Sequence, residues 1–221
     1  MENAELPGLD RLLTVCGRLG LRVVTTPPGK NPPMPFAHVG GMPLDPLLAS
    51  FYRRMGRGMF AADVDGLGVF RVDDDVNTLQ TENAAVRDSW QKGLFSSLLV
   101  FGGEPGLAHY YATVPSLADE QGRQPVVWVD TYEQGYALPV ASTVDRLFDT
   151  YSRYLEALVA HEDFKADGAA ALRFQWRMPH LLARDERLVQ LIREGRFDAW
   201  LPGQEGREWA AKVIAAHQRP S

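Results

Sequence analysis

Apolar positions along the chain follow two different spacings, and each spacing predicts a different element. Residues 9–19 carry leucines at helical intervals before Gly20, which predicts a short first helix with Cys16 buried on its apolar face. Asp45 followed by Pro46 predicts the start of a second helix, because aspartate caps helix N-termini and proline suits the first turn.

The middle of the chain has the period of two that is typical of strands. In "LAHYYATV", residues 107–114, His109 and Tyr111 share one face, and Tyr110 lies on the other. Pro139 lies inside the last strand-like run and predicts an edge position or a bulge. The expected strands are a hairpin over 59–75 and runs at 96–101, 107–114, 125–131 and 136–141.

The helical spacing returns after these strands. Residues 144–159 carry one continuous apolar stripe, which predicts a helix that packs on the sheet. We expect Ser142 to cap it, with Asp145 completing a weak capping box. The pattern predicts an α+β domain in residues 1–161. Residues 162–221 are expected to form a helical C-terminal extension packed on it.

Composition and charge narrow the function classes. The chain has 221 residues, 45% of them apolar, and a net charge of −5. Residues 1–161 hold 13 basic and 19 acidic side chains, which disfavours direct nucleic-acid binding and favours a partner with a basic surface. We expect neither a membrane span nor a signal peptide, so the predicted location is the cytoplasm. A single cysteine excludes an intrachain disulfide and a thiolate metal cluster.

The segment "FGGEPG", residues 101–106, invites a phosphate-binding interpretation. Such a loop needs its glycines between a strand and a helix, so that the helix N-terminus faces the anion. Here the glycines lie between two expected strands, and no Lys-Ser or Lys-Thr pair follows. We expect a tight turn and no cofactor.

The five histidines occur singly, without a metal-binding spacing. His109 lies within a strand, where a satisfied, half-buried histidine is expected. Glu104, Asp130 and Glu133 are at strand ends or turns, and they would form a carboxylate site only if their strands were neighbours. A small hydrolase or transferase using His109 and these carboxylates therefore stays an alternative.

Residues 43–160 resemble a known superfamily in the order of their motifs. "FYRRMGRG" precedes "GLGVFRVDD", then "LLVFGGEPGLAHYYATVP", then "PVVWVDTYEQGYALPVASTVDRLFDTYSRYLEAL". This order is similar to the SUKH superfamily, which includes fungal Smi/Knr-type cell-wall regulators and many bacterial immunity proteins. The chain departs from it at Met55-Gly56-Arg57-Gly58, where the family often has Asn-Gly-Gly. The matching positions are Phe101, Gly102, Gly103, Tyr110, Tyr111, Val126–Asp130, Glu133, Ala141, Ser142 and Phe148.

The resemblance implies a twisted, mainly antiparallel sheet packed by helices. It also implies a non-enzymatic protein-binding module. Its commonest bacterial role is immunity, in which a cytosolic protein binds a cognate toxin, often a nuclease or deaminase, and occludes its active site. An intracellular regulatory scaffold is the other role that the family suggests, and the oligomeric state stays open. The residues that we expect to bind the partner are acids and tyrosines at turns: Asp73, Asp74, Asp75, Glu104, Tyr110, Asp130, Tyr132, Glu133 and Tyr136.

Overall fold

The computed structural model describes residues 4–64, 66–72, 78–89, 94–104, 109–131, 137–201 and 203–218. Its helices are α1 (Pro7–Leu19), α2 (Pro46–Arg54), α3 (Leu79–Ser89), α4 (Val144–Val159), α5 (Phe164–Asp167), α6 (Phe174–Arg177), α7 (Pro179–Leu182), α8 (Glu186–Arg193) and α9 (Gly203–His217). Short 3-10 helices are η1 (Leu94–Ser97), η2 (Pro115–Leu117), η3 (Gly168–Ala171) and η4 (Asp198–Trp200).

The strands form one large antiparallel sheet and one small hairpin. The large sheet has the order β1-β4-β5-β6-β7-β8-β9, and β2 pairs with β3 apart from it. With the helices, this gives the α+β fold that the sequence predicts. The strands are β1 (Val24–Thr26), β2 (His38–Val39), β3 (Met42–Pro43), β4 (Arg57–Phe60), β5 (Leu67–Val69), β6 (Leu99–Gly103), β7 (His109–Thr113), β8 (Val126–Asp130) and β9 (Ala137–Ala141).

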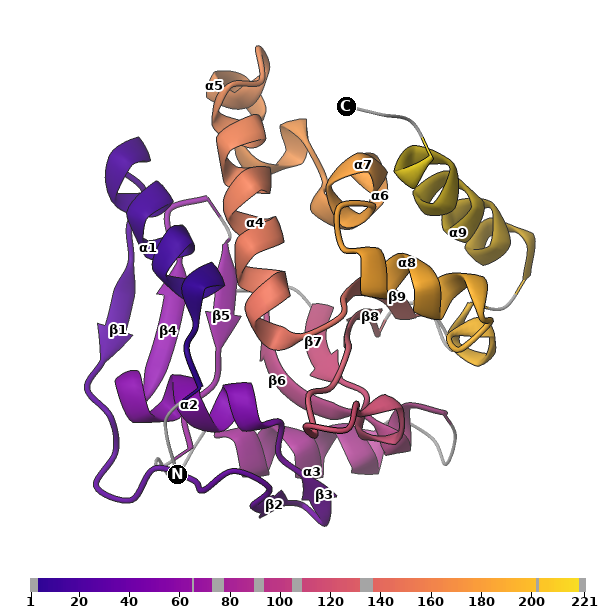
Figure 1. The fold of residues 1–221 in the computed structure, drawn as a ribbon. Helices are drawn as coiled ribbons and strands as arrows, with labels where there is room; N and C mark the ends of the chain where they lie inside the picture. The colour runs from indigo at the N-terminus through magenta and orange to yellow at the C-terminus, as the bar shows by residue number, and fades with distance from the viewer. Residues whose placement is uncertain are drawn as a thin grey trace.

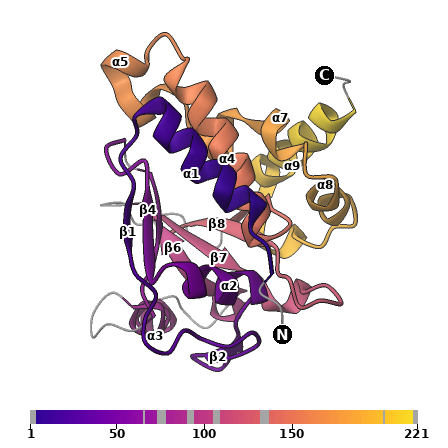
Figure 2. The ribbon, with the colours of Figure 1, turned by 60° about the vertical axis from the view of Figure 1, so that its left-hand side comes forward.

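Helices α1 and α4 lie side by side over one face of the sheet, as Figure 1 and Figure 2 show. The Asp145 carboxylate near the start of α4 accepts hydrogen bonds from the backbone N–H groups of Gly8 (2.9 Å) and Leu9 (3.1 Å). A Cβ atom at Gly8 would lie 2.0 Å from the Asp145 carbonyl oxygen, so the two helices approach this closely only with glycine there. Asp145 therefore caps α1.

The sequence prediction for the cap of α4 was wrong. Thr143, not Ser142, caps this helix, and its hydroxyl accepts a hydrogen bond from the Arg146 backbone N–H at 3.2 Å. Asp145 is turned toward α1 and completes no capping box. The Ser142 backbone N–H donates instead to the Asp185 carboxylate, at 2.7 Å. Ser142 is therefore held by Asp185, a residue distant in the sequence, and not by the local capping box.

Other local predictions are confirmed. Asp45 caps α2 by accepting from the backbone N–H groups of Leu47 and Leu48. Cys16 is fully buried, and burial raises the pKa of its thiol to about 11. Pro139 lies on β9, the last strand of the sheet, next to a register shift in the β8–β9 pairing.

A side chain of α3 satisfies the backbone of β6 at a residue that does not pair with β5. The prediction of a tight turn at Gly102 and Gly103 was wrong, because both glycines lie within β6 and pair with β5 and β7. The β6–β7 register shifts between Val100 and Gly102. Asn83 of α3 supplies the missing partners, because its amide accepts from the Val100 N–H at 2.8 Å and donates to the Val100 carbonyl at 2.6 Å. Helix α3 is therefore joined to the centre of the sheet.

The C-terminal helices pack against α4 and β9. Buried Asp185 caps α8 by accepting from the Leu188 N–H at 3.1 Å, and the same carboxylate holds the Ser142 N–H. The Tyr154 hydroxyl of α4 donates to the Leu172 carbonyl at 2.8 Å. These contacts fix the segment that forms one wall of the site described below.

We predict that Asp185→Ala lowers the free energy of unfolding by about 2–4 kcal/mol, because two buried N–H groups lose their charged acceptor. Urea denaturation followed by circular dichroism measures this change. The matched control is Arg187→Ala on the exposed side of α8, expected to change stability by less than about 0.5 kcal/mol. Equal stability of the two variants would contradict the capping role.

Candidate functional site

Three strands that are neighbours in the sheet bring polar side chains together where the strands end. Glu104 directly follows β6, His109 begins β7, and Asp130 ends β8. The antiparallel register pairs His109 with Asp130, and the Glu104 backbone N–H donates to the His109 carbonyl at 3.1 Å. The sequence predicts a carboxylate site only if the strands that carry these residues lie close together. The structure meets this requirement for Glu104 and Asp130.

The Glu104 carboxylate holds the cluster together. Its Oε1 atom accepts a hydrogen bond from the Trp128 indole N–H at 3.0 Å, and its Oε2 atom lies 2.9 Å from His109 Nδ1. The Tyr111 hydroxyl makes a longer contact to Oε1, at 3.5 Å. Both oxygens of this carboxylate are thus occupied by residues of β7 and β8.

His109 lies between two carboxylates. Its second ring nitrogen, Nε2, is 3.6 Å from the Asp130 Oδ2 atom, and its ring lies 4.7 Å from the Trp128 ring, centroid to centroid. The side chains of His109, Glu104 and Asp130 are 19%, 16% and 19% exposed, so solvent reaches all three. These three side chains are therefore partly exposed to solvent and form the base of a site, which we call the floor.

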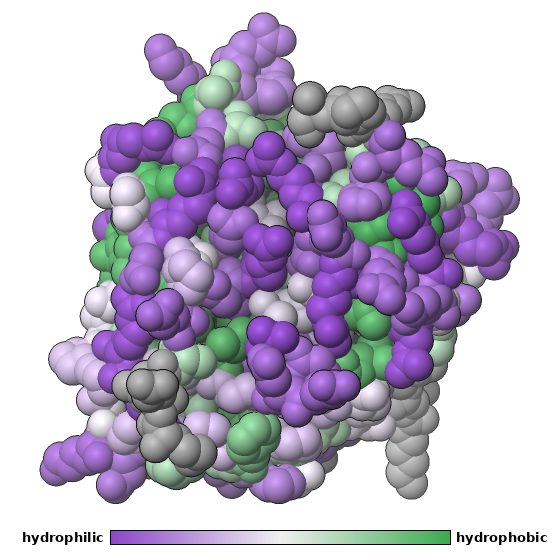
Figure 3. Space-filling model, in the orientation of Figure 1, coloured by the Kyte–Doolittle hydropathy of each residue, from purple (hydrophilic) through white to green (hydrophobic). Residues whose placement is uncertain are grey.

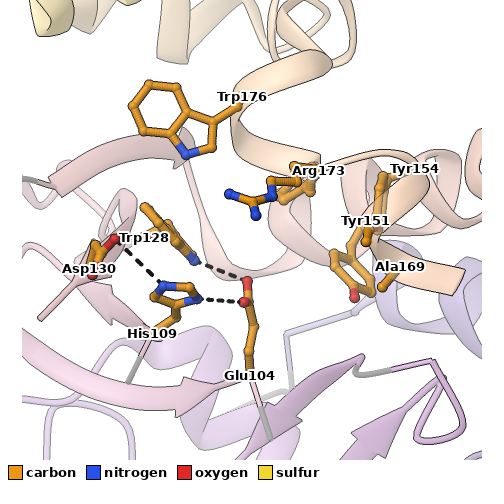
Figure 4. Close-up of a pocket in the computed structure, with 11 residues that line it drawn as sticks. Glu104, His109, Trp128, Asp130, Tyr151, Tyr154, Ala169, Arg173 and Trp176 are labelled. Carbon is orange, nitrogen blue, oxygen red and sulfur yellow. Dashed lines mark hydrogen bonds and ion pairs between the residues drawn. The ribbon is translucent and has the colours of Figure 1, made fainter. Parts of the chain in front are cut away.

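A pocket of about 290 Å³ lies over this floor. Helix α4 contributes Tyr151 and Tyr154 to its wall, and the C-terminal segment contributes Arg173 and Trp176 (Figure 4). The Arg173 side chain reaches into the space between Trp176 and the Glu104–Trp128 pair. The full lining is Glu104, His109, Trp128, Asp130, Tyr151, Tyr154, Ala169, Ala170, Arg173, Phe174 and Trp176.

The tyrosine hydroxyls near the pocket stay protonated. Burial raises the pKa of Tyr111 and Tyr151 well above the usual value and also raises that of Tyr154. The two tyrosines that line the pocket, Tyr151 and Tyr154, pack their rings against Phe174. They serve as neutral, rigid aromatic walls and not as phenolate bases.

The remaining residues predicted from the sequence are not part of this cluster. Tyr110 lies on the opposite face of β7, where its ring packs against Phe70. Burial raises the pKa of its hydroxyl, and the negative charge of Glu82 on α3 adds to this effect. The pleat of the strand separates Tyr110 from His109 and Tyr111. The predicted residues outside the described part of the chain are Asp73, Asp74, Asp75, Tyr132, Glu133 and Tyr136.

Sequence reasoning missed Trp128, Arg173 and Trp176. Trp128 could have been found, because it is two residues from Asp130 on an expected strand and so shares its face. Arg173 and Trp176 lie in the C-terminal segment, which the sequence assigned only to a helical extension. Nothing local in that segment indicates that it covers the ends of β6, β7 and β8.

Among the described residues, no cluster of histidine, cysteine, aspartate and glutamate has the arrangement of a metal site. The described helices also include none with the length and apolarity to cross a membrane. Neither a scan of protein-family models nor a search of curated proteins gave a match for this chain. The SUKH resemblance therefore stays a prediction from the sequence.

We predict that Glu104→Ala lowers the free energy of unfolding by about 1–3 kcal/mol, because Trp128 and His109 lose their shared acceptor. Glu104→Gln is the control, since its amide oxygen still accepts from the Trp128 indole and should retain more of the stability. Chemical denaturation followed by tryptophan fluorescence measures both variants. Glutamine costing as much as alanine would contradict the hydrogen-bonding role.

Proposed function

We propose that this protein is a non-enzymatic binding protein of the cytoplasm that acts as an immunity protein. Its partner is a cognate protein toxin with a basic surface, of the nuclease or deaminase type, whose active site it occludes. The SUKH-like order of motifs supports the immunity role. The surface that we assign to partner binding lies around Glu104 and Asp130, at the ends of the central strands β6 and β8.

One observation carries this proposal. The structure brings two partly exposed carboxylates, Glu104 and Asp130, to one pocket whose walls are largely aromatic. Carboxylates beside tryptophan and tyrosine form the kind of surface that recognises basic side chains, through ion pairs and cation–π contacts. These two acids are also among the partner-binding residues predicted from the sequence.

The hydropathy of the molecular surface also suits a polar partner. Residues on the face shown in Figure 3 are mostly hydrophilic, and the apolar ones form small separate patches. The net charge of −5 would steer a basic partner toward this protein and hasten their association.

A second candidate, a hydrolase or transferase, is favoured by one feature, the pocket shared by His109, Glu104 and Asp130. Two features of the same site weigh against it. A general base needs a ring nitrogen available to the substrate, yet each nitrogen of His109 faces a carboxylate. The described residues that line the pocket also include no serine, threonine, cysteine or lysine that could serve as a nucleophile.

Immunity predicts that co-expression of this protein rescues cells from a toxin encoded beside it, and that the two purified proteins form a complex. We expect Glu104→Gln combined with Asp130→Asn to weaken that complex at least about tenfold, because the two carboxylates assigned to the basic partner lose their charge. Isothermal titration calorimetry measures the change. The control is Glu120→Gln with Glu205→Gln, which removes two exposed acids elsewhere. Equal weakening by both pairs would contradict the assigned surface.

The hydrolase candidate predicts turnover that depends on His109. Purified protein is assayed with p-nitrophenyl acetate and p-nitrophenyl phosphate, alongside His109→Asn. We expect no difference between the two proteins, because His109 is engaged by Glu104 and Asp130. Turnover by the native protein that disappears in His109→Asn would favour catalysis over the proposed function.

A further inference from the structure

The pocket over Glu104 and Asp130 has room for a long side chain. Its volume of about 290 Å³ lies at the lower end of the range of small-ligand pockets, and it opens to solvent. Trp128 and Trp176 bring indole rings to it, and α4 adds two tyrosines. A narrow aromatic pocket with carboxylates at its base favours a long side chain that ends in a positive charge.

We propose that this pocket binds one lysine or arginine side chain of the partner, and that Arg173 covers the site in the free protein. The identity of the natural ligand rests on the proposed function. The site itself rests on the geometry alone.

Arg173 lines the same pocket as the two carboxylates. It follows η3 in the C-terminal segment, and its guanidinium points into the space above the Glu104–Trp128 pair (Figure 4). Within the part of the chain that the structure describes, this guanidinium makes no hydrogen bond or ion pair, and the residue is exposed. No fixed contact therefore holds it over the pocket, and an incoming cation can displace it.

The sign of the charge effect distinguishes this inference from the opposite one. If the pocket takes a cation, Arg173 repels the ligand, and removing its charge strengthens binding. If the pocket takes an anion, Arg173 attracts the ligand, and removing its charge weakens binding. The floor favours the first case, because Glu104 and Asp130 would repel a carboxylate or a phosphate.

The test uses the full chain and small probes, without any toxin. The cationic probes are Nα-acetyl-L-arginine amide and Nα-acetyl-L-lysine amide, and the neutral control is Nα-acetyl-L-citrulline amide. Binding is followed through the indole N–H signals of Trp128 and Trp176 in ¹H–¹⁵N spectra, assigned with Trp128→Phe and Trp176→Phe. We expect saturable shifts at both indoles with the cationic probes, and no such shifts with citrulline.

Two variants set the direction of the effect. Arg173→Gln should strengthen binding of the arginine probe about threefold, and Asp130→Asn should weaken it about fivefold. Arg173 is exposed, so Arg173→Gln should fold normally. Its effect on probe binding therefore tests the proposal even if Asp130→Asn is unstable. Weaker binding in Arg173→Gln, equal binding of citrulline, or saturable binding of sodium sulfate that Arg173→Gln abolishes would each overturn the proposal.

The outcome is separate from that of the immunity test. Cationic probes that bind while no toxin is neutralised would retain the pocket as a cation site and reject the immunity role. Toxin neutralisation without probe binding would retain the immunity role and reject this pocket as the point of contact.

Discussion

The antiparallel register of β6, β7 and β8 is the constraint that places the polar floor of the site. In this register His109 lies opposite Asp130, and Tyr111 lies opposite Trp128. A shift of one residue in β7 would turn His109 to the far face and bring Tyr110 beside Asp130. Glu104 reinforces the pairing of β7 with β8, because its carboxylate contacts His109 on one strand and Trp128 on the other.

The site also depends on a segment distant in the sequence. Asp185 joins the start of α8 to the junction of β9 and α4, and Tyr154 holds the Leu172 carbonyl. These contacts place Arg173 and Trp176 over the ends of the central strands. The C-terminal extension is therefore a wall of the candidate site and not only an addition to the α+β fold.

Local patterns predicted much of this fold. The first helix ends at Gly20, Asp45 caps α2, and the alternation in residues 107–114 correctly separates Tyr110 from His109 and Tyr111. The cap of α4 was predicted wrongly for a long-range reason. Asp185 takes the Ser142 N–H, and Asp145 turns to α1, so neither completes the local capping box.

The sequence by itself determined most element types and the presence of Glu104 and Asp130 at strand ends, because each depends on near neighbours in the chain. It did not determine that Gly102 and Gly103 are strand residues, because their pairing depends on β5 and β7. The tertiary structure alone decided that these acids face one histidine, because strand order and register are set by packing over the whole sheet. It also decided that Arg173 lines the same pocket, since docking of the C-terminal segment depends on contacts between residues far apart in the chain.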